Sequence, residues 1–144
     1  MRVSAEIVLP VPAEGVWEVL TDWERQVEWM KDADSVRVLT SHREGVGVRI
    51  GVKTRVLNVP AFTEVLEVIE WEPPARLLMG HRSFIRGTGE WKLKAAVEGS
   101  RFTWTEDISL PVPLLGELAL IVYRPFMRYL MRAAVQALRE ALQA

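Results

Sequence analysis

The sequence contains no cysteine and only two histidines, His42 and His81. The missing cysteine excludes disulfide bonds, thiolate nucleophiles and thiolate metal ligands, and it suits a reducing, cytoplasmic compartment. The histidines lie far apart in the sequence and belong to no HxxxH or HExxH pattern. We therefore expect no metal site and treat both as ordinary structural residues. A GxSxG motif is also missing, so the sequence indicates no catalytic triad, no other catalytic residue and no cofactor.

Long apolar runs and an excess of basic charge are missing as well. No uninterrupted apolar stretch reaches the ~18 residues that a transmembrane helix needs, and the first ten residues alternate rather than form a signal sequence. The net charge is −1, which provides no basic surface for nucleic acid. With 144 residues, 49% of them apolar, the chain has the size of one globular domain, which we expect to span residues 1–144.

Strand-like alternation of apolar and polar residues dominates the sequence from its start to residue 110. It predicts seven strands, at residues 3–9, 35–41, 46–55, 62–71, 75–84, 87–97 and 101–110. Residues 13–30 show helical spacing instead, and Asp22 is a plausible cap, so we expect two short helices with a break near Thr21–Asp22. From about residue 114 to the end the spacing is again helical, which predicts one long C-terminal helix.

The order of these elements predicts the architecture. Successive strands joined by short turns favour antiparallel pairing. A sheet of about seven strands has a large apolar face, and the long C-terminal helix is the main element available to cover it. Two layers can bury that face only if the sheet curls around the helix. The sequence therefore predicts an α+β helix-grip fold: a curved antiparallel sheet wrapped around a long C-terminal helix.

Three passages resemble the START-like superfamily, also called the polyketide cyclase/dehydrase and lipid-transport or SRPBCC superfamily. IVLPVPAEGVWEVLTDWERQVEWM is similar to its opening strand, proline turn and aromatic helix pair. VIEWEPPARLL is similar to a strand-turn-strand corner, and GSRFTWTEDISLP to the last strand. The resemblance implies an internal cavity for a hydrophobic ligand such as a lipid, sterol, quinone or polyketide, and cyclisation activity in some members.

The apolar faces of the strands and helices predict the lining of such a cavity. The expected lining residues are Met30, Val48, Ile50, Val52, Val65, Ile69, Leu78, Arg82, Phe84, Trp91, Trp104, Glu106, Leu118, Val122 and Phe126. Glu106 is unusual among them because it shares an apolar face with Trp104, and a carboxylate in that place needs a partner. Arg82 is the predicted partner. A salt bridge at the rim of the sheet is the competing interpretation.

Two apolar segments fall in predicted loops, at residues 56–62 and 110–115. They are typical of a lid around a cavity mouth or of a patch for transient contact with a membrane or partner. The leading hypothesis is a binding, transport or chaperone role for a hydrophobic small molecule. A polyketide aromatase/cyclase-type enzyme is the first alternative, with Glu106 as a proton-moving group, and a protein-interaction module with a filled core is the second. The oligomeric state stays open.

Overall fold

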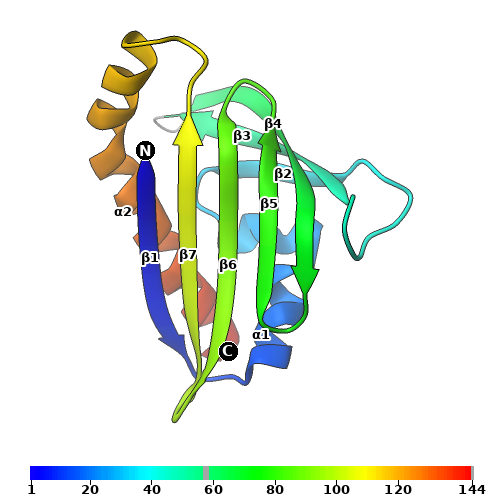
Figure 1. The fold of residues 1–144 in the computed structure, drawn as a ribbon. Coiled ribbons are helices and arrows are strands. Elements are labelled where there is room, and N and C mark those ends of the chain that lie inside the picture. The colour runs from blue at the N-terminus through cyan, green and yellow to red at the C-terminus, as the bar shows by residue number, and fades with distance from the viewer. Residues whose placement is uncertain (57–58, 144) are drawn as a thin grey trace.

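The computed structural model describes residues 1–56 and 59–143, and its sheet is seven-stranded and antiparallel (Figure 1). The strands are β1 Arg2–Leu9, β2 Ala33–Val38, β3 Arg49–Val56, β4 Val59–Glu72, β5 Arg76–Arg82, β6 Arg86–Ala96 and β7 Gly99–Ser109. Their order in the sheet is β1-β7-β6-β5-β4-β3-β2. Strands β2 to β7 pair with their neighbours in sequence, and β1 pairs with β7. The predicted helix-grip fold is confirmed.

The helices occupy the predicted places. Helix α1 spans Ala13–Leu20, and the second short helix, η1, is a 3₁₀ helix at Trp23–Glu28. The predicted break therefore lies at Thr21–Asp22, between them. Helix α2 spans Leu115–Gln143 and runs along the side of the sheet formed by β1 and β7, while β2 to β4 curl away behind (Figure 1). The curl leaves α2 and the short helices inside one concave surface.

The hydrophobic core is filled most completely where the C-terminal half of α2 packs. Met131, Ala134, Val135 and Leu138 belong to the same buried cluster as the side chains of β1, α1 and η1. Leu138 is 0% exposed. A fully buried side chain of this size contributes roughly 2 kcal/mol of hydrophobic free energy. This end of the fold therefore holds the helix on the sheet, and the opposite end of α2 is free to stand away from it.

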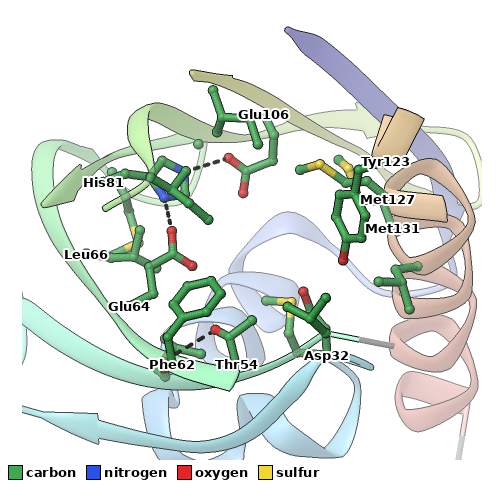
Figure 2. Close-up of a pocket in the computed structure, with 18 of the residues that line it drawn as sticks. Asp32, Thr54, Phe62, Glu64, Leu66, His81, Glu106, Tyr123, Met127 and Met131 are labelled. Carbon is green, nitrogen blue, oxygen red and sulfur yellow. Dashed lines mark hydrogen bonds and ion pairs between the residues drawn. The ribbon is translucent and has the colours of Figure 1, made fainter. Parts of the chain in front are cut away.

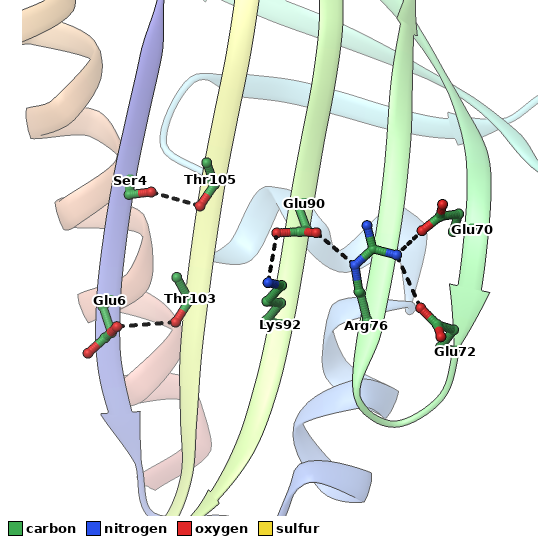
Figure 3. Close-up of polar contacts among 9 residues, drawn as sticks. All are labelled: Ser4, Glu6, Glu70, Glu72, Arg76, Glu90, Lys92, Thr103 and Thr105. Atoms are coloured by element: carbon green, nitrogen blue, oxygen red, sulfur yellow. Dashed lines mark hydrogen bonds and ion pairs between the residues drawn. The ribbon is translucent and has the colours of Figure 1, made fainter.

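The convex face of the sheet is polar and carries ladders of ion pairs (Figure 3). Arg76 on β5 contacts Glu70 and Glu72 on β4 and donates to Glu90 on β6, with 2.7 Å between Arg76 Nε and Glu90 Oε2. Toward the edge of the sheet formed by β1, the hydroxyl oxygens of Ser4 on β1 and Thr105 on β7 are 2.7 Å apart. Such exposed contacts add little stability individually. They show that this face meets solvent.

The predicted inner faces of β4 and β5 are wrong. The residues expected inside, Val65, Ile69, Leu78 and Arg82, lie on the convex side and are not fully buried, whereas Leu66, Val68, Leu77, Met79 and His81 face inward. Each face of β4 carries at least one glutamate as well as aliphatic residues, so alternation alone does not choose between them. A register shift between Val68 and Glu70 then moves the following residues to the opposite face.

The predicted cavity-facing side of the long helix is also wrong. Leu118 and Val122 are 58% and 73% exposed, and Phe126 packs between Tyr123 and Tyr129 rather than at the cavity. The first half of α2 reads LGELALIVY and is apolar on nearly every side. A periodic stripe cannot be located in such a segment. Docking of the C-terminal half on the core sets the rotation of the whole helix instead.

Candidate ligand-binding site

A cavity of about 410 Å³ lies between the sheet and the N-terminal half of α2. Its lining is mostly aliphatic, aromatic and methionine side chains from η1, β3 to β7 and α2. The helix contributes Ala119, Leu120, Tyr123, Met127, Leu130 and Met131. Methionine side chains are flexible and polarisable, so these walls can adapt to ligands of different shape. The size and lining are typical of a small-molecule site.

The structure brings about half of the predicted lining residues to this cavity. Met30, Ile50, Val52, Phe84, Trp91, Trp104 and Glu106 line it. Val48 is buried in the core beside it, and the remaining predicted residues, Val65, Ile69, Leu78, Arg82, Leu118, Val122 and Phe126, are not among the lining residues that the structure describes. Five of the predicted residues that line the cavity, Ile50, Val52, Trp91, Trp104 and Glu106, come from strands with one apolar face, while Met30 and Phe84 lie in connecting segments. The predicted residues that do not line it come mainly from β4, β5 and α2, whose faces are ambiguous.

Glu106 does lie on the concave side, but its partner is His81 rather than Arg82. His81 Nε2 is 3.0 Å from Glu106 Oε2, and His81 Nδ1 contacts Glu64 Oε1 on the other side of the ring (Figure 2). Trp104 Nε1 donates to the second oxygen, Glu106 Oε1, at 3.3 Å. Arg82 instead lies outside, 3.9 Å from Glu67. The cavity wall therefore carries an imidazole held between two carboxyl groups.

Strand β6 lies between His81 and Glu106 and carries glycine where it pairs with each of them. Glu106 on β7 reaches His81 on β5 across β6, where Gly87 pairs with His81 and Gly89 pairs with Glu106. A Cβ at Gly89 would lie 2.7 Å from Glu106 Oε2. Gly87 has a φ of +120° and a Cβ there would meet the Asp107 carbonyl oxygen at 2.0 Å. Gly89 thus keeps open the space that the Glu106 carboxyl group occupies, and Gly87 allows the close approach of the neighbouring backbone.

Burial and hydrogen bonding set the charge of this cluster. Burial opposes a positive charge on His81, but hydrogen bonds to Glu106 and Glu64 outweigh it and raise the pKa of the imidazole to about 10. Burial raises the pKa of Glu106, against the hydrogen bond and charge of His81. At neutral pH His81 is an imidazolium that donates from both ring nitrogens, one to each carboxyl group.

Two further polar side chains face the same cavity from the opposite wall. Asp32, between η1 and β2, and Tyr123 on α2 both line the cavity (Figure 2). Burial raises the pKa of Asp32 to about 6, against a backbone hydrogen bond, and the charges of Glu64 and Glu106 raise it further. Burial also raises the pKa of Tyr123, and the charge of Asp32 adds to the effect. Three carboxyl groups, from Asp32, Glu64 and Glu106, therefore share one cavity.

Sequence reasoning misses His81, Glu64, Asp32 and Tyr123. Neither histidine has a motif around it, so nothing local distinguishes His81 from an ordinary structural residue, and alternation places Glu64 on the face of β4 predicted to be outside. The glycines at 87 and 89 are the available signal, because two small residues on one strand face indicate that a neighbouring side chain crosses there. Asp32 lies in a turn, where alternation assigns no face.

Exposed apolar side chains surround the open end of the cavity. Phe84, in the turn after β5, is 59% exposed and lines the cavity, and Leu114 and Leu115 at the start of α2 are 79% and 69% exposed. Figure 1 places this turn and the β7–α2 connection at the same end of the molecule. The two apolar segments predicted as a lid lie here too, except that residues 57 and 58 are outside the described part of the chain. Val56, Phe62 and Leu110 line the cavity.

Neither a metal-binding cluster nor a membrane-spanning helix is found among the described residues. In residues 1–56 and 59–143 no group of three or more His, Asp or Glu side chains is arranged to hold a metal ion. Over the same residues, no helix combines the length and the apolar character required to cross a membrane. The arrangement can bind an apolar molecule, and its imidazolium and carboxyl groups can orient polar atoms or exchange protons with them.

A curved antiparallel sheet that grips a C-terminal helix around an internal cavity defines the START-like, or SRPBCC, class of proteins. The family model described as "Polyketide cyclase / dehydrase and lipid transport" matches residues 1–143. The chain belongs to this family. The resemblance in the sequence is confirmed by both findings.

Solved structures share the fold at low sequence identity. TTHA0849 from Thermus thermophilus matches with a TM-score of 0.81 and 23% identity over 99% of this chain and 97% of that one. A START superfamily protein from Mycobacterium smegmatis matches with a TM-score of 0.72 and 12% identity over 99% and 97%. The di-domain ARO/CYC StfQ of the steffimycin biosynthetic pathway matches with 0.75 and 13%, over 96% of this chain and 49% of StfQ. No curated protein matches in sequence.

Proposed function

We propose that this protein binds a hydrophobic small molecule in the cavity between the sheet and α2, as a carrier, transporter or chaperone of that molecule. The single observation that supports this most is the cavity of about 410 Å³ with a largely apolar lining and a few buried polar groups. An empty apolar space forfeits dispersion contacts along its walls, so a ligand of matching shape stabilises the fold. Such a space also argues against an interaction module with a filled core.

The affinity expected for such a ligand is moderate. Burying ~400 Å² of ligand surface at ~25 cal/mol per Å² contributes roughly 10 kcal/mol before the costs of association. After those costs, a dissociation constant on the order of micromolar is expected. Trp91 and Trp104 line the cavity, so an entering ligand should change their fluorescence.

The test has two stages. The purified protein is extracted with solvent and analysed by native mass spectrometry for a retained lipid or quinone. It is then titrated with fatty acids, fatty amines, sterols, quinones and flat polyphenols while tryptophan emission and melting temperature are followed. Met127→Trp fills the cavity from α2 and should abolish the response. Val122→Trp, on the exposed side of the same helix, is the matched control and should retain it. If no ligand class changes emission or melting temperature, the binding function is refuted.

A second function is supported by a separate observation, the imidazolium of His81 held between two carboxyl groups in the cavity wall. Cyclisation of a poly-β-ketone chain needs a pocket that folds the chain and groups that move protons beside its carbonyls. In this aromatase/cyclase-type function, His81 and Glu106 donate and accept those protons. Product analysis with a poly-β-ketone substrate tests it. His81→Gln should remove turnover while ligand-induced fluorescence changes persist.

A further inference from the structure

The groups of the cavity lining that can carry a charge at neutral pH are three carboxyl groups and one imidazole. Asp32, Glu64 and Glu106 line it, whereas no lysine or arginine does among the residues that the structure describes. With one imidazolium from His81 and three ionised carboxylates, the lining carries a net charge of −2. If two carboxyl groups are protonated the charge is zero, so the lining is not cationic in any of these states. An anionic ligand finds no positive group there that is free to receive it.

His81 does not change this conclusion, because both of its ring nitrogens already have partners. Nε2 is bonded to Glu106 and Nδ1 to Glu64. The His81 side chain is only 6% exposed, compared with 12% for Glu64 and 13% for Glu106. The His81 ring is therefore less accessible than either carboxyl group, and both of its donors are already used.

The acceptor oxygens converge on one space. Each glutamate uses one oxygen for His81, and Figure 2 shows Glu64 and Glu106 on one side of the space with Asp32 and the Tyr123 hydroxyl opposite. The charges of Glu64 and Glu106 act on Asp32, and the charge of Asp32 acts on Tyr123, so the groups are close enough to interact. A donor that enters this space therefore approaches acceptor oxygens on one wall and the negative charge of the other.

We propose that the cavity selects an apolar ligand that ends in a hydrogen-bond donor, preferentially a protonated amine, and discriminates against a ligand that ends in a carboxylate. This inference rests on the proposed binding function and names its ligand class. An ammonium group forms charge-assisted hydrogen bonds with the carboxyl oxygens. A carboxylate in the same place loses its hydration and meets like charges, which costs free energy in a buried site. A neutral alcohol lies between the two.

Three ligands with the same alkyl chain test the proposal: dodecylamine, 1-dodecanol and dodecanoate, each below its micellar concentration at pH 7. Calorimetry and tryptophan emission give their dissociation constants. Dodecylamine should bind at least about tenfold more tightly than dodecanoate, because one charge-assisted hydrogen bond has about that effect on affinity. The double variant Glu64→Gln/Glu106→Gln should lose this preference. Glu67→Gln, three residues from Glu64 but on the convex face beside Arg49, is the matched control and should keep it.

Proton exchange gives a second readout on the wild-type protein. An ammonium beside Asp32 favours its ionised form, so dodecylamine binding near pH 6 should release protons. The binding enthalpy should then vary with the ionisation enthalpy of the buffer. Asp32→Asn should abolish that variation. Asp34 is exposed, so Asp34→Asn is the control and should preserve it.

The outcomes separate the two proposals. If dodecanoate binds as tightly as dodecylamine or more tightly, the ligand class is wrong and the binding function stands. If Glu64→Gln/Glu106→Gln keeps the preference for the amine, the ligand class is also wrong. If none of the three ligands binds, the binding function fails for alkyl ligands and the inference fails with it. Should the double variant not fold, the ratio measured on the wild-type protein decides.

Discussion

His81 on β5 and Glu106 on β7 form a hydrogen bond of 3.0 Å across an intervening strand. The bond is unusual because neighbouring strands lie about 4.8 Å apart, so side chains two strands apart normally do not meet. Here β6 carries no side chain at Gly87 and Gly89, the two positions that pair with His81 and Glu106. The bond joins His81 to the buried carboxyl group of Glu106 on the wall of the cavity, and two of the predictions below depend on it.

Removal of His81 should destabilise the protein in a pH-dependent manner. His81→Gln leaves Glu64 and Glu106 without their cation, and breaking a buried pair costs about 3 kcal/mol. The pKa of His81 is raised from 6.5 to about 10. Its stabilising contribution is therefore fully present below pH 6.5 and is lost as the pH rises through 10. Urea denaturation from pH 6 to 10 should show the difference in unfolding free energy between wild type and variant shrinking over that range.

The exposed His42 provides the control for this experiment. His42→Gln should change the unfolding free energy by less than about 0.5 kcal/mol. A constant difference between wild type and His81→Gln from pH 6 to 10 would contradict a charged His81.

Asp32→Asn should stabilise the protein at neutral pH but not in acid. Burial raises the pKa of Asp32 from 3.8 to about 6, so the folded protein holds this proton more tightly than the unfolded chain. The cost of ionising Asp32 is absent below about pH 4, grows as the pH rises to 6 and is constant above that. Two pKa units correspond to about 3 kcal/mol, and partial solvation reduces this to roughly 1–2 kcal/mol. Thermal melts of wild type and variant at pH 4 and pH 7.5 measure it; an equal shift at both pH values would refute the assignment.

Gly89→Ala should disturb the His81–Glu106 bond without unfolding the sheet. The added methyl group would lie 2.7 Å from Glu106 Oε2, and a carboxyl group can rotate away at modest cost. We expect a loss of about 1 kcal/mol in unfolding free energy and a lower pKa for His81, measured from its imidazole nitrogen resonances. At Gly51 on β3, the atoms nearest to an added Cβ belong to Leu39, at 3.6 Å, so Gly51→Ala is the matched control and should leave the His81 pKa unchanged.

The rotation of α2 can be checked with two aliphatic residues close together on the helix. Leu120 is 7% exposed and Val122 is 73% exposed. Leu120→Ala should lower the unfolding free energy by about 2–3 kcal/mol, because it removes buried methyl groups. Val122→Ala should change it by less than about 0.5 kcal/mol. Chemical denaturation of the two variants compares them directly, and a larger loss at Val122 would favour the helix face predicted from the sequence.

Where one side of an element is clearly apolar, the sequence predicted the structure well. On β7, Phe102 and Trp104 alternate with Arg101 and Thr103, and this placed Glu106 on the concave side correctly. The same reasoning placed Trp91 on β6 and Ile50 on β3 at the cavity. It failed on β4, where both faces carry aliphatic residues and a glutamate and where a register shift lies between Val68 and Glu70.

What the sequence determined by itself is the fold class, the number and order of its elements and the inner faces of β3, β6 and β7, because strand periodicity and turn residues are local properties. Only the tertiary structure decided how α2 is rotated, which face of β4 and β5 turns inward, and which base meets Glu106. The physical reason is that these choices depend on packing between elements far apart in the chain. His81 and Glu106 meet across a strand that has glycine at the two positions between them, and no local pattern around either residue contains that information.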